Sequence, residues 1–268
     1  MKRTLVAIGL LTGCAGRLSE SQEYYVGRAV AARSIAETKG GVHEDEALHE
    51  YVAKVGWTIA LASDRPDTYQ GYHFLVLHTN EVGAWAAPSG FIFVTTGALA
   101  LMENEDQLAA VLAHEIAHVA LKHPEEVAQK EASKAGIMDV LALGGEALKA
   151  LGQEEWAKLL EGFGGCVDEG LKRGIAGYGR ESEMAADKMG IDFLTRAEVG
   201  YNPGALADFL TRLPQREGEA ATGPYATHPG AQERIDAIRA DVQKRGLSLE
   251  IDPGRTTRYR QMTARLHP

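Results

Sequence analysis

The segment His114-Glu115-Ile116-Ala117-His118 constrains this chain more than any other, because it puts two histidines four residues apart inside a helical pattern. An α-helix turns by about 100° per residue, so positions i and i+4 lie on one face. Two imidazoles on one face can hold a single zinc ion, and Glu115 beside them can take a proton from a zinc-bound water. The alternative is two core histidines with backbone partners and a surface glutamate.

The residues around this segment follow the pattern of an amphipathic helix. Asn104 is the predicted N-cap, and Gln107 stands three residues on, at the position of a capping-box partner. The apolar residues that recur at helical spacing are Leu108, Leu112, Ile116 and Val119. They predict a face that packs on the core, and buried imidazoles on such a helix need partners, of which a metal is one.

A second predicted helix begins near Arg180 and carries two acids on one face, Glu183 and Asp187. Zinc sites that do chemistry take three protein ligands and leave one position for water, so Glu183 can be the third ligand. Asp187, one turn later, can accept the free ring N–H of a ligand histidine and fix its tautomer. Gly190 on the same face would let this helix approach another closely. Taken alone, this pattern also suits an ordinary amphipathic helix with solvated acids.

Together the two patterns, H-E-x-x-H and then R-x-x-E-x-x-A-D over residues 180–187, resemble a known family. It is the zinc metallopeptidase family that includes HtpX and the CAAX prenyl endoproteases, peptidase family M48, and the chain is most similar to its periplasmic BepA-like branch. The resemblance implies that His114, His118 and Glu183 bind one Zn²⁺ per chain, with Glu115 as the general base. It also implies an α+β fold, mostly α: a zincin-like metallopeptidase with a small β-sheet beside the H-E-x-x-H helix and a helical cover.

Several other segments have clear patterns of their own. Hydrophobic periodicity predicts helices over residues 20–38 and 44–63, and β-branched and aromatic residues predict strands over 73–79 and 91–95. Between the two metal-binding helices, the Ala- and Leu-rich residues 125–175 predict a helical hairpin that forms a fixed cover of the site. The abundant glycines in this stretch make a movable lid the alternative.

The segment from Gly83 to Ala87 reads as an edge strand. An extended peptide adds to such an edge through main-chain hydrogen bonds, so Ala84, Trp85 and Ala86 are predicted to line the substrate groove. A packed core aromatic is an equal alternative for Trp85.

Two positions near this edge depart from the family pattern N-A-F-A-x-P-G-G. Gly83 replaces the asparagine and Ser89 replaces a glycine. Neither belongs to the metal set, so the departures bear on the groove and on the substrate sequence that the groove prefers.

The beginning of the chain predicts a compartment. Met1-Lys2-Arg3 is followed by a short apolar stretch, which is a signal-peptide layout over residues 1–13. Leu11-Thr12-Gly13-Cys14 resembles a bacterial lipobox, which implies a lipid anchor on Cys14, where several acyl chains anchor stably. Because Ala15 follows the cysteine, sorting to the outer membrane is expected rather than to the inner membrane, with the protein in the periplasm. The alternative is a cleaved secretory signal with an incidental cysteine.

The predicted domains are residues 1–13 as a signal peptide of lipoprotein type, 14–245 as the zinc metallopeptidase domain and 246–268 as a basic C-terminal tail. After Asp252 the tail has four arginines and no acid, which predicts solvated disorder, with contact to an anionic surface as the alternative. The formal net charge of −9 argues against nucleic acid as a main partner. Cys166 is expected to be a small buried residue outside any disulfide.

His228 follows a predicted loop over residues 214–224. The motifs Thr227-His228-Pro229 and Glu233-Arg234-Ile235 are similar to a C-terminal signature of the family. Two roles are open for His228 at the metal: it occupies the fourth position and holds the enzyme inactive, or it stabilises the tetrahedral oxyanion. The third reading is a residue that packs at a helix start. His123 is expected to be structural.

The sequence therefore predicts a zinc-dependent endopeptidase of the bacterial cell envelope. Glu115 would take a proton from the zinc-bound water, which attacks a peptide carbonyl polarised by the metal. By the resemblance, the substrates are misfolded or stalled envelope proteins, and the outer-membrane assembly machinery is a partner. The competing prediction is a chaperone-like binding module for outer-membrane protein assembly, with a latent or closed zinc site.

Overall fold

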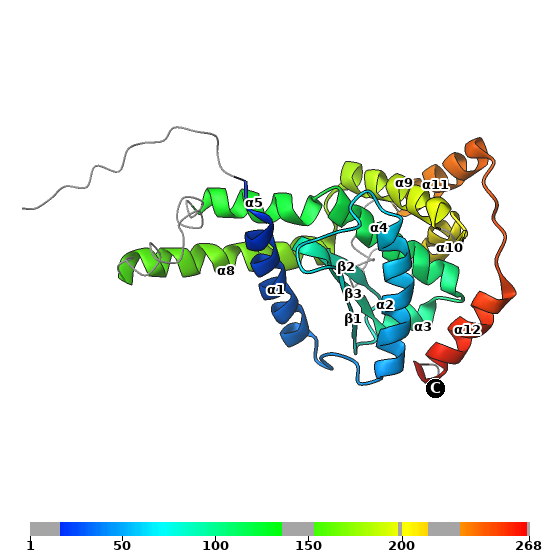
Figure 1. Cartoon of the computed structure of the whole chain (residues 1–268), viewed down its shortest axis with the longest axis horizontal. Coiled ribbons are helices and arrows are strands. Elements are labelled where there is room, and N and C mark those ends of the chain that lie inside the picture. The colour runs from blue at the N-terminus through cyan, green and yellow to red at the C-terminus, as the bar shows by residue number, and fades with distance from the viewer. Residues whose placement is uncertain (1–16, 136–152, 198–199, 214–230, 267–268) are drawn as a thin grey trace, which may run out of the picture.

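The computed structural model describes residues 17–135, 153–197, 200–213 and 231–266. The predicted signal peptide, Cys14 and His228 lie outside these residues. In the described part, many helices surround one three-stranded sheet, which confirms the predicted α+β, mostly α class (Figure 1). None of its helices is both long and apolar enough to span a bilayer.

The elements in chain order are α1 (Glu20–Glu37), α2 (Glu46–Leu61), β1 (His73–Leu77), β2 (Ala84–Ala87), the 3₁₀ turn η1 (Pro88–Gly90), β3 (Phe91–Thr95), α3 (Thr96–Leu101), α4 (Glu105–Ala120), α5 (His123–Lys134), α8 (Gln153–Ala176), α9 (Arg180–Arg196), α10 (Ala205–Arg212), α11 (Ala231–Arg245), α12 (Pro253–Thr263) and η3 (Ala264–Leu266). The first two helices and the strands lie where the sequence predicts them.

The sheet has the order β1-β3-β2, with β1 parallel and β2 antiparallel to β3. The central strand β3 is buried along its whole length. Successive side chains point to opposite faces of a strand, and the two faces belong to different hydrophobic clusters. Ile92 and Val94 pack with α2 and α4, whereas Phe91 and Phe93 pack with α1, α5 and α8. Strand β2 forms an edge of the sheet, as predicted.

The helix that carries the two histidines, α4, runs through the middle of the molecule. It begins at Asn104, whose side chain accepts a hydrogen bond of 3.0 Å from the Gln107 N–H. The Gln107 side chain accepts from the N–H of Glu103 at 2.9 Å, one residue before the cap. Every residue from Glu105 to Val119 is buried. The helix is therefore enclosed on all sides, and not only along the predicted apolar stripe.

Helices α5 and α8 lie side by side and extend away from the sheet (Figure 1). They form the helical hairpin predicted between the two metal-binding helices, and the residues that join them, 136–152, lie outside the described part. Cys166 on α8 is buried and free, and its thiol lies 3.6 Å from the carbonyl oxygen of Ala128 on α5. This position agrees with the expected small buried residue.

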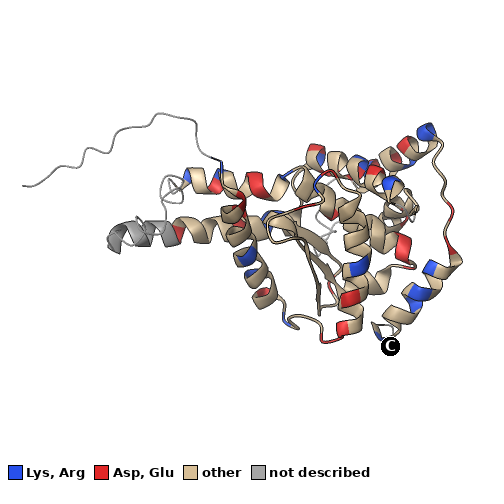
Figure 2. Cartoon of the chain, in the orientation of Figure 1, with Lys and Arg blue, Asp and Glu red and all other residues tan. Residues whose placement is uncertain are grey.

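The predicted disorder of the C-terminal arginines is wrong, because residues 253–263 form α12 (Figure 2). Arg255 bonds to Asp106 at 3.0 Å and Arg258 to Glu105 at 2.6 Å, and both acids are buried in the first turn of α4. Tyr259, directly after Arg258, is buried and donates to the Leu99 carbonyl. Two arginines of this segment therefore pair with buried acids of α4.

Ser89, one of the two departures from the family pattern, has a left-handed backbone with φ 62° and ψ 23°. Only glycine adopts this conformation without cost, which explains why the family pattern has glycine there. The Ser89 N–H donates to the Glu125 carboxylate at 3.2 Å, and Arg65 holds the same carboxylate at 2.7 Å. The strained residue is thus held by a buried ion pair.

Candidate metal centre

His114, His118 and Glu183 converge on one point, and their donor atoms all lie within 4.8 Å of one another. The two histidine Nε2 atoms are 3.0 Å apart, and the Glu183 oxygens lie 3.3 Å from His114 Nε2 and 3.6 Å from His118 Nε2. All three side chains are fully buried. The structure therefore brings together donors from α4 (Glu105–Ala120) and α9 (Arg180–Arg196).

The spacing of these donors fits a metal ion. Zinc binds nitrogen at about 2.0–2.1 Å and is usually tetrahedral, so neighbouring ligand atoms should be roughly 3.3 Å apart. The three observed distances scatter around that value. Two imidazoles and one carboxylate are also a donor set that zinc accepts, and three ligands leave one position for water. The residues present thus fit a catalytic type of metal site.

Close packing of two helices brings the third donor into place. Glu183 lies in the first turn of α9, which packs along α4. At Gly190, a Cβ atom would lie only 3.4 Å from the Ala113 carbonyl carbon and the His114 nitrogen. A longer side chain at this position would push α9 away from α4. The close approach predicted for Gly190 is therefore present, and it holds Glu183 against the histidines.

A second layer of charged groups surrounds the donors. Asp187 lies 2.9 Å from His114 Nδ1, the ring nitrogen remote from the other donors, as predicted. Arg234 on α11 holds both oxygens of Asp187 at 2.7 Å and lies 3.1 Å from Glu183. No role for Arg234 is predicted from the sequence, although Arg234 lies in the Glu233-Arg234-Ile235 motif. The spacing of the apolar residues on α11 could have indicated that Arg234 is buried. Arg234 stands next to Ile235 and one turn before Ile238, and all three lie on the buried face of the helix.

These contacts shift the protonation equilibria of the metal-free site. Burial and the charge of Arg234 lower the pKa of His114, but hydrogen bonds to Asp187 and Glu183 outweigh them and raise it to about 9. Burial raises the pKa of Asp187, yet the Arg234 charge and the bonds from His114 and Arg234 hold it below its ordinary value. Without a metal, a proton therefore resides on His114, and a metal ion would have to displace it.

Glu115, the predicted base, is buried beside the donor set. Burial and then the negative charge of Glu115 are the main causes that raise the pKa of Tyr178 well above its ordinary value. The Tyr178 ring packs against His118, with 4.7 Å between ring centroids. The Glu115 carboxylate therefore lies near the side of α4 that carries the donors.

The three residues predicted to line a substrate groove, Ala84, Trp85 and Ala86, are all buried. Trp85 stacks on Phe93 at 5.3 Å, and its ring N–H donates to Ser34 at 3.3 Å, as a core aromatic does. The hydrogen bonding of the β2 main chain shows which of its groups face the outer edge of the sheet. Gly83 O accepts from the Thr95 N–H, so by strand alternation Ala84 and Ala86 direct their main-chain groups away from β3.

That outer edge of β2 is in contact with the end of α8 and the turn after it. The Tyr178 hydroxyl donates to the Ala86 carbonyl oxygen at 3.0 Å, and a Cβ atom on Gly174 would lie 3.2 Å from the same oxygen. Tyr178 stands between Gly177 and Gly179, whose φ angles are 82° and 103°. A peptide that pairs with β2 at Ala86 would therefore have to displace Tyr178, and the groove role of these residues stays a prediction.

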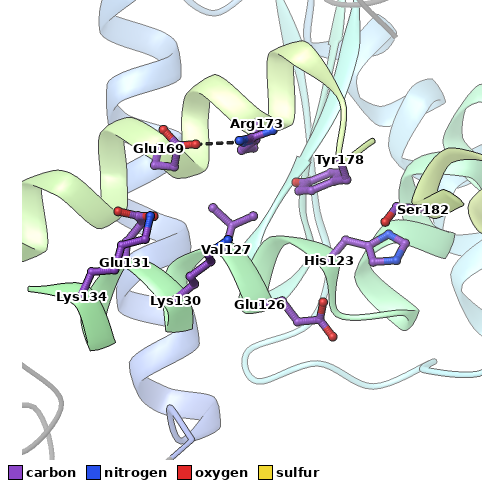
Figure 3. Close-up of a pocket in the computed structure, with 10 residues that line it drawn as sticks. All are labelled: His123, Glu126, Val127, Lys130, Glu131, Lys134, Glu169, Arg173, Tyr178 and Ser182. Atoms are coloured by element: carbon purple, nitrogen blue, oxygen red, sulfur yellow. Dashed lines mark hydrogen bonds and ion pairs between the residues drawn. The ribbon is translucent and has the colours of Figure 1, made fainter. Parts of the chain in front are cut away.

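A cavity of about 270 Å³ opens beside the donor set, between α5 and α8 (Figure 3). His123, Tyr178 and Ser182 lie at one end of it, and Lys130, Glu131 and Lys134 at the other. The His123 ring contacts both His118 and Tyr178. The cavity therefore reaches from the second layer of the candidate metal centre along the hairpin.

Comparison with known proteins agrees with this geometry. The sequence model of peptidase family M48 matches residues 44–242. The chain is 28% identical over 197 residues to the beta-barrel assembly-enhancing protease of Escherichia coli (strain K12). The aligned region covers 73% of this chain and 39% of that relative. It is 26% identical to the metalloprotease YcaL of the same organism, over 79% of the chain and 78% of YcaL.

A third relative, the metalloprotease LoiP of Escherichia coli (strain K12), is 24% identical over 92% of the chain and 99% of its own length. The chain spans about two fifths of the length of the beta-barrel assembly-enhancing proteases that it matches. The family match covers both helices that carry the donor set. The chain belongs to peptidase family M48.

Proposed function

We propose that this chain is a zinc-dependent endopeptidase of the bacterial cell envelope. The observation that carries the proposal is the spacing of 3.0, 3.3 and 3.6 Å among three buried donors, with the buried acid Glu115 beside them. Family membership and the metalloprotease relatives support it. His114, His118 and Glu183 would hold the ion, and Asp187 and Arg234 would hold His114 in the orientation that binding requires.

Zinc, when bound there, supplies a Lewis acid that polarises a peptide carbonyl and lowers the pKa of water. Glu115 accepts the proton of the attacking water and passes it to the leaving amine, which is general base and then general acid catalysis. The burial of Glu115 keeps bulk water away from this proton transfer. His228 is proposed to act at the same site, either as an inhibitory fourth ligand or as a group that stabilises the oxyanion.

The proposed substrates are misfolded or stalled envelope proteins. One relative is named a beta-barrel assembly-enhancing protease, and by analogy the outer-membrane assembly machinery is a proposed partner. The lipobox-like sequence before Cys14 supports a lipid anchor that holds the enzyme in the periplasm at the outer membrane. Unfolded chains suit this enzyme, because an extended segment can pair with a strand edge and a folded one cannot.

The contact between Tyr178 and the edge of β2 favours a second candidate function. With that edge covered, the protein could bind assembling outer-membrane proteins in the manner of a chaperone while the centre stays closed. The two functions differ in whether the chain cleaves a peptide bond.

Casein cleavage and metal content, measured on the same preparations, distinguish them. Wild type, Glu115→Gln and His228→Ala are compared, with His78→Ala, directly after β1 and outside the donor set, as a control. We expect one zinc per chain, cleavage abolished in Glu115→Gln and unchanged in His78→Ala. Higher activity in His228→Ala supports self-inhibition, and lower activity supports an oxyanion role. Zinc without cleavage in all variants favours the binding module, and absence of zinc rejects the metal centre.

A further inference from the structure

The remote ring nitrogens of the two histidine donors have different partners. For His114, Nδ1 contacts the Asp187 carboxylate at 2.9 Å. For His118, Nδ1 lies 2.8 Å from Nδ1 of a third histidine, His123, which the sequence analysis treated as structural. A histidine that binds a metal needs a partner at its other nitrogen, because this partner fixes the tautomer and the orientation of the ring.

The chain reversal between α4 and α5 sets the place of His123. Helix α4 ends at Ala120, and Lys122 adopts a left-handed conformation with φ 62° and ψ 24°. This single residue turns the chain, so that α5 begins at His123. The strain of a left-handed lysine is retained only where the surrounding structure holds it. Because the chain reverses at Lys122, the His123 ring packs against the His118 ring, with 5.0 Å between the two ring centroids.

The direction of the hydrogen bond follows from the donor set. Nε2 of His118 faces His114 and Glu183, so it must offer its lone pair to a metal. A neutral imidazole carries one proton, which must then be on Nδ1 of His118. His118 therefore donates to Nδ1 of His123, and the proton of His123 resides on its Nε2. His123 also lines the cavity between α5 and α8, together with Ser182 and Glu126 (Figure 3).

We propose that His123 is a positioning residue of the metal centre: it accepts the Nδ1 proton of His118 and so aims Nε2 of His118 at the ion. The inference rests on the proposed metal site. Tyr178 completes the arrangement, since its ring packs on both histidines, at 4.7 Å from His118 and 5.7 Å from His123. The centre is thus held from two sides, by Asp187 through His114 and by His123 through His118.

Zinc affinity of the full chain, measured by competition with a chromophoric chelator, tests the inference. His123→Leu keeps apolar bulk and removes the acceptor, and we expect zinc to bind about 10–100-fold more weakly, as for other residues that support a ligand. His123→Asn puts an amide oxygen near the place of Nδ1 and should restore most of the affinity. Glu126→Gln, in the same turn of α5 and on the same cavity, is the matched control and should bind zinc as wild type does.

Two further measurements separate positioning from packing. The visible absorption of the cobalt(II)-substituted protein should change in His123→Leu and return toward wild type in His123→Asn, because the spectrum reports the geometry at the ion. The thermal unfolding midpoint of the metal-free variants should differ little between Leu and Asn. If both variants lose affinity equally, or if His123→Leu binds zinc as wild type does, the inference is wrong.

The same measurements distinguish a failure of the role of His123 from a failure of the peptidase proposal. A wild type that cleaves casein, with an unchanged zinc affinity in His123→Leu, overturns only the role of His123. A wild type that binds zinc without cleavage, with the expected loss in His123→Leu, overturns only the peptidase proposal.

Discussion

The hydroxyl of Tyr178 donates a hydrogen bond of 3.0 Å to the main-chain carbonyl oxygen of Ala86, on the outer edge of β2. This carbonyl is one of the groups that an extended substrate would use, because Ala86 directs its main chain away from β3. The ring of the same tyrosine packs against His118. One side chain therefore links the candidate metal centre to the strand where a substrate is proposed to pair.

Replacing Tyr178 by phenylalanine removes this hydrogen bond and keeps the ring. A net hydrogen bond contributes about 0.5–1.5 kcal/mol, so kcat/KM for a peptide cut from an unfolded protein should rise about two- to tenfold. The rise should come mainly through a lower KM, because the substrate no longer competes with the hydroxyl. A fluorogenic peptide assay measures both constants. Tyr25→Phe, at an exposed tyrosine, is the control. A hundredfold fall in kcat with zinc retained would assign the hydroxyl to the reaction itself.

Arg234→Leu should destabilise the metal-free protein strongly. Arg234 is buried between Asp187 and Glu183, and its loss leaves these two buried carboxylates with His114 as the one positive group among their described contacts. Breaking one side of a buried ion pair costs about 3–5 kcal/mol. Urea unfolding with and without zinc measures the loss of free energy of unfolding. Zinc should make this loss smaller, because the ion neutralises Glu183.

Arg239 on the same helix provides the comparison for Arg234. Its side chain is about half exposed and lies 3.8 Å from an equally exposed Asp208. Arg239→Leu should change the free energy of unfolding by less than about 1 kcal/mol. Equal effects of the two substitutions would contradict the role given to Arg234.

The metal-free protein should lose stability as the pH rises from about 6.5 to 9. The folded-state pKa of His114 is about 9 against an ordinary 6.5, so its contribution is fully present below 6.5 and disappears as the pH rises through 9. Asp187 acts in the opposite sense: its pKa is lowered, so its contribution is present above 3.8 and is lost on acidification. Urea unfolding at pH 6, 7.5 and 9 tests the loss of stability expected from His114.

Zinc binding depends on the same proton. Because the ion displaces it from His114, the apparent zinc affinity should rise over the same pH range, with about one proton released per ion at pH 7.5. Calorimetry in buffers of different ionisation enthalpy counts the protons. A metal-free stability that does not fall between pH 6.5 and 9 would show that His114 is already neutral there.

Arg255→Leu should destabilise the protein far more than Arg260→Leu. Arg255 on α12 lies 3.0 Å from the fully buried Asp106, whose pKa is raised by burial. Removing the arginine takes the ion-pair partner from this acid, which keeps the hydrogen bond from the Asn202 N–H, at a cost of about 3–5 kcal/mol. Arg260 on the same helix is exposed and should matter little. Thermal unfolding of both variants measures the difference, and equal midpoints would mean that α12 does not stabilise α4.

Cys166 should resist alkylation in the native protein. The thiol is buried between α8 and α5, and burial raises its pKa to about 11, so little thiolate forms at pH 8. Iodoacetamide should label it only in guanidinium chloride, and peptide mapping reads this site separately from Cys14. Rapid labelling under native conditions would indicate that α8 opens away from α5.

The local patterns of the chain predicted much of the fold and most of the donor set. His114 and His118 share a helix face because of their spacing alone, and Glu183 and Asp187 do so on the second helix. Periodicity of this kind depends only on neighbouring residues, so it can be seen before the chain folds. Local spacing and local composition likewise predict the first two helices and the three strands.

The predictions that failed or were missing concern partners that lie far apart in the chain. The C-terminal arginines resembled a solvated tail because Asp106 and Glu105, the acids that they bond, lie about 150 residues earlier. Arg234 had no assigned role because its partner Asp187 is on another helix. The covering of β2 by Tyr178 could not be foreseen, because no local pattern tells which side chain will reach a given carbonyl.

By itself, the sequence determined which residues can bind a metal and which helices carry them, because helical spacing follows from covalent geometry and side-chain type. Only the tertiary structure decided how the donors are held and whether the strand edge is open. Asp187 with Arg234 and His123 complete the surroundings of the two histidines, and Tyr178 covers the edge at Ala86. These contacts form only when distant segments pack together, since the desolvation of charged and polar groups favours partners that close packing brings within hydrogen-bond distance.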